Sequence, residues 1–220
     1  MSDRETRRQI IVAVTGASGA VYARRLVECL SASPVTVHLV VSPNGQRLLH
    51  DELGIRKLSV EALIGTASPD VLLYPYHDVG ARIASGSFLT DGMVISPCSS
   101  NTLASVAAGL GGNLIDRAAA VTLKEMRRLI LVTREMPMSR IELTNALRLS
   151  EAGAIICPAS PGFYLRPQRI EDLVDFVVGK VLDLLGVAHA LDTRWTGSRD
   201  VAPRRENFSP ERPSVLEADS

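Results

Sequence analysis

The segment that most constrains this chain is IIVAVTGASGA, residues 10–20, where an apolar run leads directly into Gly16-x-x-Gly19. A helical pattern follows from Val21. A parallel strand that ends at a helix N-terminus brings free backbone N–H groups and the helix dipole to one point, which favours an anion. The glycines allow a ligand to approach the backbone closely, and Ser18 adds a hydroxyl. The segment predicts a phosphate-binding first turn in an α/β fold.

Features that the turn lacks narrow the class of phosphate ligand that it could bind. A dinucleotide fingerprint needs a third glycine and an acidic residue about 20 positions later to hold a ribose. Tyr22 stands where the third glycine would be, and the next strand ends in Ser42-Pro43 without Asp or Glu. A short-chain dehydrogenase would need Tyr-x-x-x-Lys, and no tyrosine has a lysine four residues later. These absences argue against NAD and favour a mononucleotide such as FMN.

Apolar strand patterns alternate with helical patterns along the chain. After the first strand we expect strands at 35–41, 71–74, 92–96, 129–132 and 154–157, and helices at 21–30, 44–53, 59–64, 99–108, 113–126, 141–152 and 170–185. Continuous apolar strands between helices indicate a parallel sheet that is covered on both faces. We therefore predict a three-layer, doubly wound α/β sandwich, Rossmann-like or flavodoxin-like, with residues 1–195 as one flavoprotein-type domain and 196–220 as a polar, mobile tail.

Composition excludes several classes of protein. Lys+Arg and Asp+Glu number 24 each, so no excess charge favours nucleic acid. The three cysteines lack metal-ligand spacing and suit reduced thiols in a cytosolic protein. The polar N-terminus lacks the apolar core of a signal peptide, and no apolar run reaches the roughly 18 residues of a membrane span. We expect a cytoplasmic protein without a nucleic-acid or membrane partner.

Polar and charged residues follow several of the predicted strands. Ser99, Ser100, Asn101 and Thr102 open a helix, where they would either cap it or face the same ligand as the first turn. Arg134-Glu135 follows another strand, as an exposed ion pair or as part of a site. Because ligands of such folds bind beyond the strand C-termini, we favour the site in both cases.

Several other residues allow both a structural and a functional interpretation. Arg117 and Lys124 lie seven apart on one helix face, which is either solvated or part of a site. Tyr164 follows a proline-rich corner and can donate to a phosphate. His38, inside a strand, is expected to be packed rather than catalytic. Trp195 either anchors the tail or offers a π-face to a cation.

With these motifs assembled, the chain resembles the flavin prenyltransferases (UbiX family), within the flavin-containing Cys decarboxylase-like fold group. The resemblance runs from about residue 9 to Trp195. It rests on TGASGA at 15–20, ASGSF at 84–88, PCS at 97–99, DRAA at 116–119 with LKE at 123–125, RE at 134–135, GFY at 162–164, PQ at 167–168 and RW at 194–195.

The resemblance implies an enzyme that joins a dimethylallyl group from dimethylallyl phosphate to N5 and C6 of FMN, making prenylated FMN for UbiD-type decarboxylases. The implied FMN ligands are Gly16, Ala17, Ser18, Ser42, Ser99, Ser100, Asn101, Thr102 and Arg134. Lys124, Tyr164 and Lys180 match the substrate phosphate site, with Arg117 nearby. Glu52 and Glu135 match carboxylates for proton transfer, and Trp195 matches an aromatic in the prenyl pocket. The family also implies a homo-oligomer, a dodecamer, with the site between subunits.

The chemistry of these residues is consistent with that reaction. Lys, Arg and a Tyr hydroxyl can stabilise the departing phosphate without a metal. No Asp-rich cluster for a magnesium-bound diphosphate is apparent, so we expect no metal. Lys180 departs from the family pattern, which usually has arginine, and loses the bidentate fork. This departure leaves the donor preference open.

Two other functions remain to be weighed. An FMN-dependent decarboxylase of a cysteine-containing substrate shares the fold, but those enzymes have Pro-x-Met-Asn where residues 137–140 read PMSR. A catalytically inactive flavin-binding protein is the third hypothesis, and Lys180 is its only hint in the sequence. Formation of prenylated flavin separates the three.

Overall fold

The apolar runs of the sequence form the strands of one sheet. The computed structural model describes residues 7–194, so predictions for Trp195 and the tail lie outside the described residues. The strands are β1 (Arg8–Val14), β2 (Val35–Val41), β3 (Val71–Tyr74), β4 (Gly92–Cys98), β5 (Leu129–Thr133) and β6 (Ile155–Ile156). All neighbouring strands are parallel, in the order β3-β2-β1-β4-β5-β6. This is the order of the Rossmann fold rather than that of flavodoxin.

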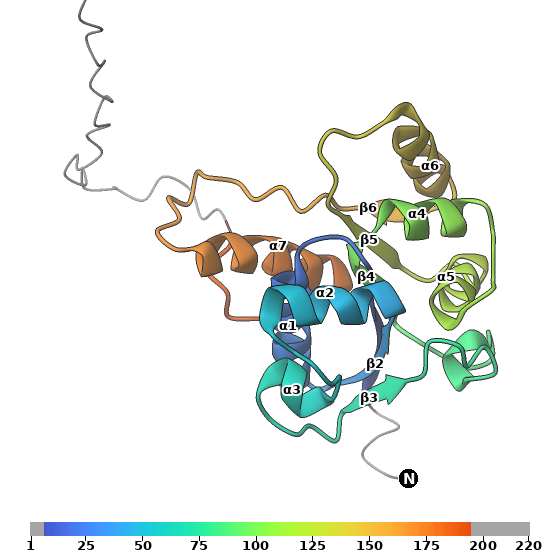
Figure 1. Ribbon diagram of the computed structural model, residues 1–220, viewed down its shortest axis with the longest axis horizontal. Helices are drawn as coiled ribbons and strands as arrows, with labels where there is room; N and C mark the ends of the chain where they lie inside the picture. Colours follow the sequence, from blue (N-terminus) through green and yellow to red (C-terminus); the bar gives the residue numbers. More distant parts are fainter. Residues whose placement is uncertain (1–6, 195–220) are drawn as a thin grey trace, which may run out of the picture.

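Helices cover both faces of the sheet (Figure 1). One face carries α1 (Ala20–Ser31), α2 (Pro43–Leu53), α3 (Val60–Ile64) and α7 (Ile170–Leu185). The other carries α4 (Ser100–Ala107), α5 (Leu114–Lys124), α6 (Arg140–Glu151) and the short 3₁₀ turn η1 (Arg82–Ala84). Successive residues of β1 alternate between the two hydrophobic cores, since Ile10 and Val12 belong to one and Ile11 and Ala13 to the other. The predicted three-layer, doubly wound fold is confirmed.

The chain reverses its winding direction at β1. From β1 it proceeds outward to β2 and β3, then crosses back to β4 and continues outward to β5 and β6. The carboxyl ends of β1 and β4 are therefore neighbours at a topological switch point, where ligands of open α/β sheets bind. No helix within residues 7–194 is long and apolar enough to cross a membrane.

His38 lies in the middle of β2 and is fully buried, as the sequence predicts. Its Nε2 lies 2.8 Å from Gln9 Oε1 and its Nδ1 lies 3.0 Å from the Tyr74 hydroxyl. The Phe88 ring meets the imidazole edge-to-face at 5.2 Å, and the Arg82 guanidinium lies over the Phe88 ring, 4.0 Å from its centroid. Burial, with the nearby Arg82 charge, lowers the pKa of His38 to about 4, so the imidazole is neutral.

Candidate active site

A threonine couples the carboxyl ends of β1 and β4 at the switch point. The Thr15 backbone N–H and hydroxyl both donate to the Pro97 carbonyl, at 3.2 and 2.8 Å. The Ser99 backbone N–H donates to the Thr15 hydroxyl oxygen at 2.8 Å. The turn at 16–18 and the turn at 99–102 are thereby fixed beside each other, as the sequence predicted. Sequence reasoning missed the role of Thr15, although its place at the end of a buried strand was a signal.

The N-terminus of α1 already holds an anion from within the chain. The Glu52 carboxylate, from the last turn of α2, accepts from the Gly19 N–H at 3.1 Å and from the Ala20 N–H at 2.8 Å. The N–H groups of Gly19 and Ala20 are therefore paired within the chain, and the predicted ligands of the first turn are the residues before them, Gly16, Ala17 and Ser18. Gly16 has a packing role, because a Cβ there would lie 2.6 Å from Asn44 Cβ on α2.

The loop after β5 reaches both of these turns. Arg134 Nε donates to the Ser18 carbonyl at 3.1 Å, and the Ser100 hydroxyl donates to Glu135 Oε2 at 2.9 Å. The structure therefore places Arg134 and Glu135 at the switch point rather than in an isolated surface ion pair. Ser99 caps α4, since its hydroxyl oxygen accepts from the Thr102 N–H at 3.3 Å. The capping interpretation is correct for Ser99, whereas Ser100 orients Glu135.

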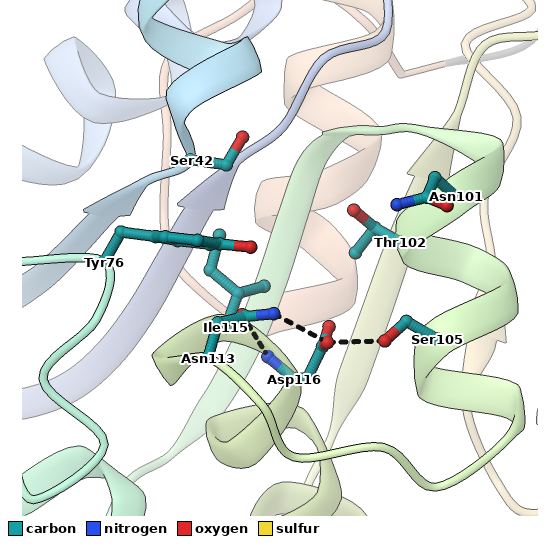
Figure 2. Close-up of a pocket in the computed structure, with 8 residues that line it drawn as sticks. All are labelled: Ser42, Tyr76, Asn101, Thr102, Ser105, Asn113, Ile115 and Asp116. Atoms are coloured by element: carbon teal, nitrogen blue, oxygen red, sulfur yellow. Dashed lines mark hydrogen bonds between the residues drawn. The ribbon is translucent and has the colours of Figure 1, made fainter.

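A polar cavity of about 120 Å³ lies beside these turns (Figure 2). Its lining residues are Ser42, Tyr76, Asn101, Thr102, Ser105, Asn113, Ile115 and Asp116. Ser42 caps α2 and Asn113 caps α5, so together with α4 three helix N-termini border the cavity. Such an arrangement favours an anion.

Asp116 makes one part of this cavity negative. Its Oδ2 accepts from Asn113 Nδ2 at 2.7 Å and from the Ser105 hydroxyl at 2.5 Å, and only 5% of the residue is exposed. Because this carboxylate lies in the first turn of α5, the N-termini of α2 and α4 are the better places for a phosphate. The hydroxyl and N–H donors there, at Ser42 and residues 99–102, fit a flavin mononucleotide.

Lys124 and Arg117 line a second cavity, of about 280 Å³, on the α5 face of the sheet. Lys124 forms a short ion pair with Glu125. This pair lies against the backbone of Gly86, since a Cβ there would be 2.2 Å from Glu125 Oε1 and 2.8 Å from Lys124 Nζ. Arg127 holds the same loop, as its Nη2 donates to the Gly86 carbonyl at 2.7 Å. No local sequence pattern indicates this arginine contact.

Tyr164 and Lys180 line a third cavity, of about 330 Å³, together with Phe176, Asp183, Thr193 and Arg194. The Tyr164 and Phe176 rings meet edge-to-face at 5.7 Å. α7, which carries Lys180, lies on the opposite sheet face from α5, which carries Lys124. Within one copy, therefore, the four predicted phosphate-binding residues divide into two pairs in separate cavities.

Cys98, at the end of β4, is not a poised nucleophile. Burial raises its pKa to about 12, and the Asp116 charge acts in the same direction. A thiol in this environment stays protonated at neutral pH. The Pro97-Cys98-Ser99 motif therefore contributes through backbone geometry rather than through thiolate chemistry.

Known proteins share both the fold and the sequence of this chain. The family model described as Flavoprotein matches residues 1–182. The flavin prenyltransferase UbiX of Halalkalibacterium halodurans is 47% identical over 193 residues, covering 86% of this chain and 94% of the relative. That of Pseudomonas aeruginosa is 44% identical over 195 residues, covering 85% of this chain and 93% of the relative.

A solved structure repeats the architecture. AnUbiX (PadA1), crystallised in complex with FMN and dimethylallyl pyrophosphate, superposes with a TM-score of 0.79 at 41% identity, covering 88% of this chain and 100% of that one. The family resemblance drawn from the strand-end motifs is confirmed by these matches. This chain belongs to the flavoprotein family and, within it, to the UbiX flavin prenyltransferases.

Proposed function

We propose that this flavin prenyltransferase joins a dimethylallyl group from dimethylallyl phosphate to N5 and C6 of reduced FMN. The observation that carries the proposal is the 41% identity, over the whole fold, to a protein crystallised with FMN and dimethylallyl pyrophosphate. The convergence of the turns at 16–18 and 99–102 with Arg134 supports it. These relatives do not favour a decarboxylase of cysteine-containing substrates or an inactive flavin-binding protein.

FMN would be held at the switch point. Its phosphate would meet Ser42 and the N-terminal turn of α4 at residues 99–102, where hydroxyls and N–H groups are donors. The turn at 16–18 and Arg134 would border the rest of the molecule. Reduced FMN supplies the nucleophilic nitrogen and carbon that accept the dimethylallyl group.

The donor phosphate would be bound by two neighbouring copies. Lys124 and Arg117 from one copy and Tyr164 and Lys180 from another would surround it, because one copy separates these pairs on opposite faces. The cations and the phenol hydroxyl stabilise the phosphate as the allylic C–O bond breaks. A dodecameric FMN-dependent UbiX-like decarboxylase from Escherichia coli O157:H7, at a TM-score of 0.79 and 41% identity over 86% of this chain and 100% of that one, supports a homo-oligomer.

Carboxylates at the switch point would handle protons. Glu135, oriented by the Ser100 hydroxyl, would remove the C6 proton when the new ring closes. Glu52, fixed on the N-terminus of α1, is the second candidate for proton transfer. Trp195 would shelter the allylic cation from water.

The experiment incubates purified protein with FMN, a reductant and dimethylallyl phosphate, and then measures the mass of the flavin. A mass increase of one C5 unit is expected. Unchanged flavin with decarboxylation of a cysteine-containing peptide would instead identify the decarboxylase, and bound but unchanged flavin without turnover would identify a binding protein. We further propose that the reaction takes place in the cytoplasm and that a UbiD-type decarboxylase receives the product.

A further inference from the structure

A cationic side chain beyond the four predicted phosphate-binding residues lines the cavity of Tyr164 and Lys180. It is Arg194, which lies beside Asp183 in this cavity of about 330 Å³. We propose that Arg194 binds the phosphate of the dimethylallyl donor and supplies the planar fork that Lys180 lacks. This inference rests on the proposed function and adds a residue to its substrate site.

The Arg194 guanidinium is anchored by Asp183, on the last turn of α7. Its Nε lies 3.2 and 3.4 Å from the two carboxylate oxygens, and its Nη2 donates to Oδ1. No hydrogen bond within residues 7–194 uses Nη1 of this side chain, so its two N–H groups and the second N–H group of Nη2 remain for another acceptor. A guanidinium carries five donors in a rigid plane and can bridge a carboxylate and a phosphate at once.

A buried histidine fixes Asp183 in turn. The Leu191 backbone N–H donates to His189 Nδ1 at 3.2 Å, which leaves the ring proton on Nε2. Nε2 then donates to Asp183 Oδ1 at 3.2 Å, and the imidazole side chain is only 4% exposed. The carboxylate therefore has two independent donors, and its orientation sets that of Arg194.

The segment that carries Arg194 also approaches α7 closely. A Cβ on Gly179 would lie 2.4 Å from Thr193 Oγ1 and 3.0 Å from Thr193 Cγ2. Glycine is unfavourable inside a helix, because alanine would stabilise the helix itself. The glycine at this buried position of α7 allows residue 193, and with it Arg194, to lie against the cavity.

The charges in this cavity suit a phosphate ester. Lys180 and Arg194 contribute two positive charges and Asp183 one negative charge, which leaves a net positive charge. No carboxylate forms an ion pair with Lys180 in the part of the chain that the structure describes. A lysine acts on phosphate as a point charge, whereas an arginine donates in pairs. The two side chains therefore complement each other.

The test measures binding separately from turnover. Protein loaded with oxidised FMN is titrated calorimetrically with dimethylallyl phosphate and, separately, with inorganic phosphate, a probe without a prenyl group. Arg194→Gln should weaken the binding of both by about tenfold or more, the usual effect of losing a charge-assisted hydrogen bond. Arg194→Lys should retain part of the affinity. Gly179→Ala removes no charge, but it should also weaken the binding of both ligands, because its Cβ displaces Thr193 and with it Arg194. Arg169→Gln is the matched control, because Arg169 pairs with Asp172 on the same helix, away from the cavity.

Unchanged affinity for inorganic phosphate in Arg194→Gln would overturn the inference, even if the donor bound more weakly, since the arginine would then act on the prenyl side or only on the fold. Circular dichroism and oligomer size confirm that each variant is folded, and the two Arg194 variants decide the matter if Gly179→Ala does not fold. If the unmodified protein binds both ligands but makes no prenylated flavin once FMN is reduced, the proposed function fails while the phosphate contact stands.

Discussion

Lowering the pH from 7 to 5 should destabilise this fold through one buried group, the imidazole of His38. Its pKa is lowered to about 4 in the folded chain, whereas an unfolded chain titrates at about 6.5. Between these values the unfolded state binds more protons than the folded state, so the free energy of unfolding decreases as the pH falls. The contribution of His38 is fully present above the unfolded pKa and is lost as the pH falls toward the folded one.

The size of the effect follows from the two pKa values. Each pKa unit corresponds to about 1.4 kcal/mol, so protonation of the unfolded state costs about 2 kcal/mol of stability at pH 5 and roughly 0.2 kcal/mol at pH 7. A difference of about 2 kcal/mol is a large part of the roughly 5–15 kcal/mol that stabilises a typical domain. For a chain of this length it lowers the melting temperature by roughly 4–8 °C.

Urea unfolding at both pH values, followed by circular dichroism at one protein concentration, tests this reasoning. His38→Gln does not titrate, so it should be less stable than the unmodified chain at pH 7 but should lose about 2 kcal/mol less on going to pH 5. Equal pH dependence in the His38 variant and the unmodified chain would refute the assignment.

Two contacts at the site give further predictions. Gly86→Ala should raise the KM for dimethylallyl phosphate about tenfold, because its Cβ displaces the ammonium group of Lys124. Gly80→Ala is the control and should leave the KM unchanged, because its Cβ would lie 3.5 Å from its nearest neighbour. Equal kinetics of the two variants would contradict the steric argument. Ser100→Ala should slow flavin prenylation about tenfold even at saturating FMN, because Glu135 loses its donor, and Ser100→Thr should restore the rate. A full rate of Ser100→Ala at saturating FMN would contradict the role of Ser100 in orienting Glu135. Glu135→Gln should retain FMN but stall product formation, and an unchanged turnover rate would exclude it from the mechanism.

Much of the fold could be predicted because its signals are local. The strand at 71–74 and the helix at 170–185 have the predicted bounds, since apolar runs and helical periodicity mark them directly. Other helix ends differ by one or two residues: α2 begins at Pro43 rather than at residue 44 because Ser42 is its cap. The prediction that His38 is packed is confirmed, because a side chain in the middle of a strand that is covered on both faces is buried.

The site was less predictable because its contacts join distant parts of the chain. Glu52 is 33 residues from the N–H of Gly19 that it binds, and no local pattern connects them. Asp116 was recognised only within a family motif, and its burial beside Ser105 depends on how α4 and α5 pack. The division of the phosphate-binding residues between two sheet faces follows from the topology, which a motif does not reveal.

The carboxylate seated on α1 has a consequence for how a nucleotide orients itself. Several helices direct the positive ends of their dipoles toward the switch point. A phosphate monoester attracted equally to all of them would bind in more than one orientation. With Glu52 acting as a built-in counter-anion, one of these poles is already neutralised. We therefore expect the phosphate to bind at the N-termini of α2 and α4 rather than at that of α1, which would limit the bound flavin to one orientation.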